Sequence, residues 1–402
     1  MKVIYLSPVP LQSFAQRPHH FVHWLRKAFT AEVLWIETPP IRFPRWSDLS
    51  LMAASASVGT ARGGEQTQSW VHEPWIVRLR LPGLPFEPSS IGRTINQLAW
   101  GPSRARIARW LYSGLGRRGR GYSKAWLVVG RPCHAALWLH QCFPELSVVY
   151  DVMDDMAAFY HGASSNWVRQ CDNALVGIAS DIMVSSKKLL QRYQQRTQNC
   201  HFVPNGLAIS EGRLGDLRTM LEIRKGQSAK HKHPVFGYIG SIAAWFDWLL
   251  IVELCRRLKS EGFQRFTIKL IGPIHVEVPK DLPHEVIIKP PISQEMIWDE
   301  LEKFDIALIP FKQTQLTESV DPVKFYEYRA AGLPVLSSHF GDMALRNESD
   351  GVYFFEAVLK GQITIEAILL ANSIPDASFY NNHCWSTRFA RLVCFKETLS
   401  TT

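Results

Sequence analysis

Residues 321–335 read Asp-Pro-Val-Lys-Phe-Tyr-Glu-Tyr-Arg-Ala-Ala-Gly-Leu-Pro-Val, which predicts a polar loop, a short helix and then an apolar strand. The preceding apolar run, Phe304–Pro310, predicts a parallel strand. Lys324 and Glu327 are three residues apart, so they share one face at the start of the helix. Open α/β sheets bind ligands beyond the carboxyl ends of their strands, where helix N-termini converge. A cation and a carboxylate at that place suit a ligand with both phosphate and sugar hydroxyls.

This segment resembles the nucleotide-sugar motif of retaining GT-B glycosyltransferases, in particular family 4, also called glycosyltransferase group 1. The family pattern is K-x-x-E-x-x-A-x-G-x-P-V after a polar loop. Its positions in this chain are Lys324, Glu327, Ala330, Gly332, Pro334 and Val335. The simpler alternative is an amphipathic helix that ends in an ordinary glycine turn.

Apolar runs alternate with helical patterns along the chain. This alternation implies parallel sheets, and two such arrays imply two doubly wound domains. The resemblance implies a GT-B architecture, an α/β fold in which two Rossmann-like domains face a cleft. We predict an N-terminal acceptor-binding domain over residues 1–205 and a C-terminal nucleotide-sugar-binding domain over residues 206–380. The predicted strands are 3–7, 33–37, 75–80, 125–130, 147–151, 181–185, 201–203, 235–239, 267–271, 286–288, 305–310, 334–338 and 352–355.

The segment 383–399 places apolar side chains on one helical stripe. In GT-B enzymes the C-terminal helix crosses back to the first domain, and we predict the same for residues 381–402. The alternative is an ordinary final helix of the second domain. Two polar stretches, 48–68 and 224–233, predict a loop and an interdomain linker.

Length and composition indicate a globular protein of two domains, with 402 residues and 46% hydrophobic content. The seven cysteines form no C-x-x-C pair, which indicates reduced thiols rather than a disulfide scaffold or a zinc ribbon. The chain begins with a strand pattern instead of a signal peptide, and it contains no apolar run of membrane-spanning length. We therefore expect a cytoplasmic protein.

The net charge of +9 is concentrated in the first half of the chain. Residues 1–205 hold 23 Lys and Arg against 12 Asp and Glu, whereas the remainder holds 22 against 24. A cluster of arginines interleaved with aromatic residues predicts a peripheral contact with an anionic membrane surface, here the cytoplasmic face of the inner membrane. The alternative is a solvated helix face, and no nucleic-acid motif is present. The cluster comprises Arg104, Arg106, Arg109, Arg117, Arg118 and Arg120.

The string Gln-Arg-Pro-His-His, residues 16–20, follows the first predicted strand. It resembles the N-terminal motif of a polysaccharide-synthesis subgroup of these glycosyltransferases. Arg17, His19 and His20 are accordingly predicted to hold acceptor hydroxyls or phosphate. The alternative is a helix start with proline in its first turn.

Three acids, Asp151, Asp154 and Asp155, stand at the end of the strand 147–151. Many family-4 enzymes have a His-Asp pair at the matching place, where this chain has Met153 and Asp154. We predict Asp154, Asp151 and His19 as catalytic residues. A magnesium site is the rival interpretation of the acids, but GT-B transferases normally work without metal, so no metal and no cofactor are expected.

Gly240 and Ser241 end the first strand of the second domain, and Asp247 precedes a helix. Such a small-residue turn cradles a diphosphate through backbone N–H groups. The pattern is not G-x-G-x-x-G, which argues against a nicotinamide cofactor. Family-4 enzymes usually carry Arg or Lys after this turn; because this chain has none before the helix, Lys324 is expected to supply most of the phosphate-facing charge.

The family's E-x7-E pair is incomplete in this chain. Counting back from Glu327 places Ser319 at the first glutamate, and Glu318 is one residue out of register. Val203-Pro-Asn-Gly206 matches the family's interdomain turn, although Ala208 stands where Asp is usual. The predicted donor-binding residues are Lys324, Glu327, Gly240, Ser241, Asp247, Ser319 and Val323.

These observations predict a glycosyltransferase that moves a sugar from a nucleotide diphosphate sugar to a lipid-linked or polysaccharide acceptor, with retention. Two alternatives stay open: a nucleotide-sugar 2-epimerase on the same fold, and a non-catalytic glycosyltransferase-like subunit that binds a partner or glycan. The sequence does not identify the donor base, the donor sugar, the acceptor or the linkage.

Overall fold

The computed structural model describes residues 1–39, 41, 73–113, 125–209, 213, 215, 219, 233–371, 375–392 and 395. Its contacts divide the chain into two units. The first comprises residues 1–185, 189–203 and the segment from Leu392 onward; the second comprises residues 186–188 and 204–391. The predicted loop 48–68, most of the predicted linker 224–233, and Arg117, Arg118 and Arg120 lie outside the described residues.

The first domain is built on a seven-stranded parallel sheet with the order β3-β2-β1-β4-β5-β6-β7. The direction of chain progression reverses between β1 and β4, which is the topological switch point of a doubly wound sheet. The strands are β1 (Lys2–Ser7), β2 (Glu32–Glu37), β3 (Ile76–Arg80), β4 (Ala125–Val129), β5 (Ser147–Val152), β6 (Asp181–Val184) and β7 (Cys200–Phe202).

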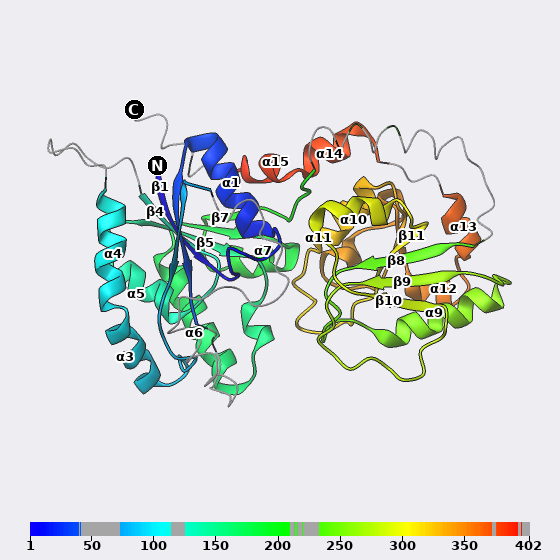
Figure 1. The fold of residues 1–402 in the computed structure, drawn as a ribbon, viewed down its shortest axis with the longest axis horizontal. Coiled ribbons are helices and arrows are strands. Elements are labelled where there is room, and N and C mark those ends of the chain that lie inside the picture. Colours follow the sequence, from blue (N-terminus) through cyan, green and yellow to red (C-terminus); the bar gives the residue numbers. More distant parts are fainter. Residues whose placement is uncertain are drawn as a thin grey trace. The chain divides into compact units, whose positions relative to one another are not determined.

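Helices cover both faces of this sheet, and Figure 1 shows α1 (Arg17–Phe29) across β1 from α4 (Gly101–Tyr112) and α5 (His134–Cys142). Ile4 and Leu6 belong to one hydrophobic cluster with side chains of α4 to α7, whereas Tyr5, which points the other way, lies 6.0 Å from the Phe21 ring of α1. The remaining helices are α3 (Ser90–Ala99), α6 (Gly162–Ile178) and α7 (Lys187–Gln194), with the short η2 (Met156–Phe159).

The second domain has a six-stranded parallel sheet with the order β10-β9-β8-β11-β12-β13, so its switch point lies between β8 and β11. Its strands are β8 (Val235–Ile239), β9 (Thr267–Ile271), β10 (Val286–Lys289), β11 (Ile306–Ile309), β12 (Val335–Ser337) and β13 (Val352–Phe354). Its helices are α9 (Trp248–Ser260), α10 (Gln294–Leu301), α11 (Val323–Ala330), η3 (Gly341–Leu345), η4 (Glu348–Asp350), α12 (Phe355–Leu359), α13 (Ile365–Leu370), α14 (Ala377–His383) and α15 (Trp385–Phe389).

The prediction of one helix over 383–399 is wrong. Helix α14 ends at His383, Cys384 is extended, and α15 ends at Phe389. The interruption has a physical cause, because the chain at Cys384 forms a β-bridge with Leu207. The Leu207 N–H donates to His383 O, and the Trp385 N–H donates to Leu207 O. Beyond this point the contacts of Leu392 and Phe395 assign them to the first domain.

The described cysteines are free thiols. Among the described helices, none combines the length and the apolarity that a bilayer crossing requires.

Candidate functional site

Gly240, Ser241 and Lys324, three of the residues predicted for the donor, lie at the switch point of the second sheet. Strand β8 ends at Ile239 and is followed by Gly240 and Ser241, while the neighbouring β11 ends at Ile309. The loop after β11 leads into α11, and Lys324 is the second residue of that helix. The sequence prediction that Lys324 lies at a helix start beyond a parallel strand is confirmed.

Lys324 packs directly on the glycine turn. A Cβ atom at Gly240 would lie 2.0 Å from Cε and 2.5 Å from Nζ of Lys324. The ammonium also lies 5.6 Å from the centre of the Tyr238 ring, a cation–π distance. Gly240 has φ +153°, and a Cβ at Gly272 would lie 2.1 Å from Gly240 O, so two backbone loops approach closely here. The turn therefore needs glycine at both positions.

Lys324 and Glu327 are half-buried charged residues. In the described part of the chain neither side chain forms a hydrogen bond or an ion pair, although the two charges act on each other and the lysine lies near the Tyr238 ring. Burial lowers the pKa of Lys324, opposed by the Glu327 carboxylate. Burial raises the pKa of Glu327 to about 7, opposed by the Lys324 ammonium. Charges without an ion-pair partner are costly in a partly desolvated place. Such an arrangement is expected of groups whose partner is a bound ligand.

The N-terminus of α11 adds to this cationic character. Pro322 occupies the N-cap position, so no side chain there accepts a hydrogen bond from the first N–H groups of the helix. Uncapped N–H groups and the helix dipole attract anions. Val323, the first residue of α11, contributes one of these N–H groups.

Asp247 acts as the N-cap of α9, where its Oδ1 accepts from the Leu249 N–H at 3.0 Å. A carboxylate at this helix N-terminus disfavours a diphosphate there, and Asp247 suits sugar hydroxyls better. Ser241 contributes its carbonyl oxygen, which accepts from the Tyr238 hydroxyl at 2.8 Å.

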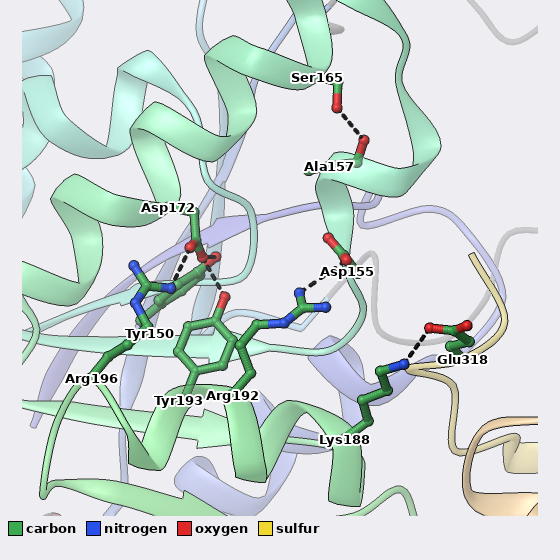
Figure 2. A network of polar contacts seen from close by, with 10 residues as sticks. All are labelled: Tyr150, Asp155, Ala157, Ser165, Asp172, Lys188, Arg192, Tyr193, Arg196 and Glu318. Carbon is green, nitrogen blue, oxygen red and sulfur yellow. Dashed lines mark hydrogen bonds and ion pairs between the residues drawn. The ribbon is translucent and has the colours of Figure 1, made fainter. Parts of the chain in front are cut away.

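Ser319 is buried, and its hydroxyl oxygen has no hydrogen-bond partner among the described residues. The neighbouring Glu318 is exposed and forms an ion pair with Lys188 (Figure 2). Ser319 and Glu318 are the two candidates for the first position of the family's glutamate pair. The first is buried, whereas the second is exposed to solvent.

Asp321, which sequence reasoning did not assign to the site, organises the loop before α11. Its carboxylate accepts from the Tyr326 hydroxyl at 2.9 Å, from Arg346 at 3.2 Å and from the Asn205 N–H at 2.8 Å. The Asn205 side-chain amide donates to Asp321 O. The Pro-Asn-Gly turn is therefore fixed to the loop that positions Lys324. A proline after an acid at a helix start is the available local signal, but the partners are remote in sequence.

In the first domain, Arg17 and Asp151 form a buried ion pair, with 2.9 Å between Nε and Oδ1 and 3% and 0% of the side chains exposed. Arg17 Nη1 also donates to Val203 O at 2.7 Å. The structure thus brings a predicted acceptor-binding residue and a predicted catalytic residue together, and each neutralises the other beneath the surface. This arrangement suits a fixed ion pair that holds α1 on β5.

His19 is buried, and its ring is engaged by backbone groups. Its Nδ1 accepts from the Gln16 N–H at 3.2 Å, and its Nε2 lies 3.2 Å from Leu11 O. Burial lowers the pKa of His19 to about 4, and the pKa of the adjacent His20 to about 3. Both rings are therefore neutral at pH 7. The contacts of His19 fix the loop after β1 and leave neither ring nitrogen for a substrate.

The acids after β5 have separate environments. Asp155 is buried and accepts from Arg192 of α7 at 2.9 Å (Figure 2), whereas Asp154 is partly exposed. Within the described residues, no three His, Cys, Asp or Glu side chains converge on a position for a metal ion. Of the three predicted acids, Asp154 is the one placed nearest to solvent.

A cavity in the first domain was not predicted. It has a volume of about 310 Å³ and lies where β1, β2, β3 and β4 end. Three arginines line it: Arg78, Arg80 and Arg131. The sequence signal was the position of Arg131, two residues beyond β4 at the switch point of the sheet.

Comparisons with known structures establish the fold class. HepE of Anabaena, crystallised with UDP and glucose, superimposes with a TM-score of 0.58 at 13% identity over 100% of both chains. Sucrose-phosphate synthase of Thermosynechococcus elongatus gives 0.61 at 11% identity, again over 100% of both chains. WaaG, a glycosyltransferase involved in lipopolysaccharide biosynthesis, gives 0.55 at 13% identity over 98% of this chain and 95% of its own. The chain has the GT-B fold, with two Rossmann-like domains.

A relative by sequence is TuaH of Bacillus subtilis (strain 168), provisionally named a teichuronic acid biosynthesis glycosyltransferase. The two are 25% identical over 224 residues, which cover 49% of this chain and 53% of TuaH. The chain thus spans about half the length of this curated relative. No family model matches the chain.

Proposed function

We propose that this protein is a glycosyltransferase that binds a nucleoside diphosphate sugar in its second domain. The observation that carries the proposal is that Lys324 and Glu327 lie together beside the glycine turn at the sheet's switch point, with no hydrogen bond or ion pair to either side chain among the described residues. The spacing of the family-4 donor motif and the name of TuaH support the same activity.

Each group has a chemical task in this proposal. The Glu327 carboxylate accepts hydrogen bonds from the ribose hydroxyls. Lys324 and the N-terminus of α11 offset the charge that builds on the diphosphate as it leaves the sugar carbon. Stabilisation of developing charge by fixed cations and dipoles is usually the largest catalytic contribution. Backbone N–H groups of the Gly240 turn complete the diphosphate cradle.

The acceptor in this proposal is a lipid-linked or polysaccharide glycan, and the transfer proceeds with retention and without a metal or cofactor. The resemblance to the polysaccharide-synthesis subgroup supports this acceptor class, as does the teichuronic acid biosynthesis in the name of TuaH. The first domain, with its excess of cations, holds the acceptor and contacts the cytoplasmic face of an anionic membrane. Arg104, Arg106 and Arg109 are exposed on α4, as this contact requires.

One observation favours a second candidate, a non-catalytic subunit that binds nucleotide sugar or glycan without turnover. Ser319 stands where the family has its first glutamate, and a buried hydroxyl cannot replace a carboxylate as a charged hydrogen-bond acceptor. Such a subunit retains the donor cradle and lacks transfer activity.

The experiment that separates the two candidates has two stages. First, a panel of nucleoside diphosphate sugars is screened for a rise in melting temperature, since a ligand that binds the native state stabilises it. Second, the stabilising donor is incubated with the protein, with and without glycan acceptors, and the released nucleoside diphosphate and the glycan product are measured. Transfer establishes the enzyme, and binding without transfer or hydrolysis establishes the subunit. If no nucleotide sugar binds, both candidates are rejected.

A further inference from the structure

The cavity of the first domain lies at the place where a doubly wound sheet is expected to bind a ligand. Its walls come from the ends of β1 and β2 and the residues that follow them, from β3, and from Arg131 beyond β4. The strands β1 and β4 are hydrogen-bonded neighbours across which the chain reverses direction. Ligands bind outside the carboxyl ends of the strands at such a reversal. The cavity volume of about 310 Å³ is at the small end of the range for ligand pockets.

The charge of this cavity is strongly unbalanced. Three arginines, Arg78, Arg80 and Arg131, line it against one carboxylate, Glu37, which leaves an excess of two positive charges. Arg78 is neutralised by Glu37, because the two form a bidentate pair with distances of 2.9 Å and 2.8 Å. Glu37 also accepts from the Leu11 N–H at 2.9 Å, which fixes the carboxylate. The excess charge is therefore that of Arg80 and Arg131.

Arg131 is a buried cation with few partners. It is 8% exposed, and its Nε is buried without a hydrogen bond. Its other two nitrogens donate to Thr38 Oγ1 at 3.4 Å and to Pro39 O at 3.2 Å, which are long, uncharged contacts. The buried carboxylate of Glu87 interacts with it electrostatically but forms no ion pair with it among the described residues. A buried guanidinium in this state is incompletely compensated.

Arg80 is exposed at the end of β3, and the described part of the chain gives it no hydrogen bond or ion pair. It is therefore free to close on a ligand at the cavity mouth. Ser13 and Gln12 also line the cavity and supply hydroxyl and amide groups of the kind that bind sugar hydroxyls.

We propose that this cavity binds the anionic group of the acceptor, held between Arg131 and Arg80, so that the acceptor is an acidic sugar or a sugar phosphate rather than a neutral glycan. The shared chemistry is a compact oxyanion, which the planar guanidinium matches in a bidentate manner. That the bound anion belongs to the acceptor rests on the proposed transferase function. The anion site itself stands on the geometry of the first domain alone.

Saturation-transfer NMR tests the proposal, because it detects the weak binding expected of monosaccharides. The protein, without donor, is titrated with glucuronate, with glucose 1-phosphate and with neutral glucose. We expect saturable transfer to at least one anion and none to glucose. Transfer to glucuronate alone identifies a carboxylate, and transfer to glucose 1-phosphate alone identifies a phosphate. Arg131→Gln and Arg80→Gln should each weaken that binding about tenfold, the effect of losing one charge-assisted contact.

Two controls keep the outcome clear. Arg106→Gln makes the same charge change at an exposed position of α4 and should bind the anion as the wild type does. Arg80 is exposed, so Arg80→Gln tests the site even if Arg131→Gln reduces stability. Nucleotide binding in the second domain should be unchanged in both variants, which separates this inference from the donor site. Equal binding of glucose and the anions, no binding of either anion, or unchanged binding in Arg80→Gln and Arg131→Gln overturns the proposal.

Discussion

The Lys324 side chain rests on the backbone of Gly240, so closely that a Cβ atom there would lie 2.0 Å from the lysine Cε. The smallest residue at the end of β8 thus sets the position of the main cation beside the glycine turn. The two positions are far apart in sequence, yet a change at either one alters the same small volume.

Lys324→Ala should weaken the binding of a nucleoside diphosphate by about 1–3 kcal/mol, because one charge-assisted contact to phosphate is lost. Glu327→Ala should weaken nucleosides as well as nucleoside diphosphates, because its contact is to ribose. Isothermal titration calorimetry with both kinds of ligand separates the two effects. Unchanged affinity in both variants would remove the donor site from α11.

Gly240→Ala should reproduce much of the Lys324→Ala defect, since the added methyl group displaces the lysine side chain. The two changes should be non-additive, because the second has little left to remove once the first is made. A double-mutant cycle on nucleoside diphosphate affinity measures this coupling. Fully additive effects would show that Gly240 acts independently of Lys324.

Donor binding should strengthen as the pH rises through about 7, where Glu327 ionises in the free protein. Ribose hydroxyls donate best to an ionised carboxylate, so the ligand favours the deprotonated form. A nucleoside without phosphate is the proper probe, because it does not titrate in this range. Calorimetry at pH 6 and pH 8 should show the difference in the wild type, and Glu327→Gln should abolish it.

The same group affects the stability of the free protein in the opposite direction. Burial raises the Glu327 pKa from 4.5 to about 7, so between these values the native state binds more protons than the unfolded state. The free energy of unfolding therefore falls as the pH rises across this window. The free energy of unfolding of Glu327→Gln, measured by urea denaturation, should not show this part of the pH dependence. An identical pH dependence in both proteins would contradict the assignment.

Transfer activity should survive an excess of chelator. The motivation is that Asp151 of β5 and Asp155 beyond it, two of the three predicted acids, are each neutralised by an arginine, Arg17 and Arg192 respectively. Initial rates with and without EDTA provide the measurement. Complete loss that magnesium restores, together with a metal bound near Asp154, would show that these acids serve a cation instead.

The protein should sediment with anionic vesicles at low salt and be released as salt is raised. Each cation near such a surface contributes about 1 kcal/mol, screened over roughly 8 Å at physiological ionic strength. Replacing Arg104, Arg106 and Arg109 of α4 by Glu should release it. The matched control replaces three exposed cations of the second domain, Arg256, Arg265 and Lys280, by Glu. Wild-type protein that stays in the supernatant would favour a soluble acceptor.

Asp321→Ala should destabilise the second domain by about 3–5 kcal/mol, because it leaves Arg346 without the carboxylate that it contacts at 3.2 Å. Glu318→Ala removes a carboxylate from the same loop, but this residue is exposed and its ion pair should contribute less than about 1 kcal/mol. Urea denaturation of the two variants should differ accordingly. Equal effects would mean that Asp321 does not fix the loop.

Strands were the most predictable part of this fold. Each predicted run is a strand, with ends displaced by a few residues at most, as for 334–338 against Val335–Ser337. Strands buried on both faces of a parallel sheet are continuous apolar runs, such as Ala125–Val129, so their signal is local. The last helix was not predictable, because it is interrupted by a bridge from Cys384 to Leu207, which lies far away in sequence.

The candidate donor site was visible in the sequence because Lys324 and Glu327 lie within one turn of one helix. The surroundings of Arg17 and Asp151 were not, since the ion pair joins residues 134 positions apart. Arg78, Arg80 and Arg131 come from the ends of two strands, β3 and β4, that only the sheet topology brings to the same edge. Spacing reveals a site carried by one element, whereas a site assembled from several elements needs the topology.

Phe395 is fully buried among aromatic residues of the first domain, 4.6 Å from the Trp126 ring and 5.9 Å from that of Phe21. The whole second domain lies between this phenylalanine and the rest of its domain in the chain. During synthesis, the first domain must therefore leave the ribosome with an aromatic gap in its core and wait until the second domain has been translated. Its final folding step is thus coupled to translation of the donor domain, so nascent chains arrested before residue 395 should expose Phe21 and Trp126 to chaperones.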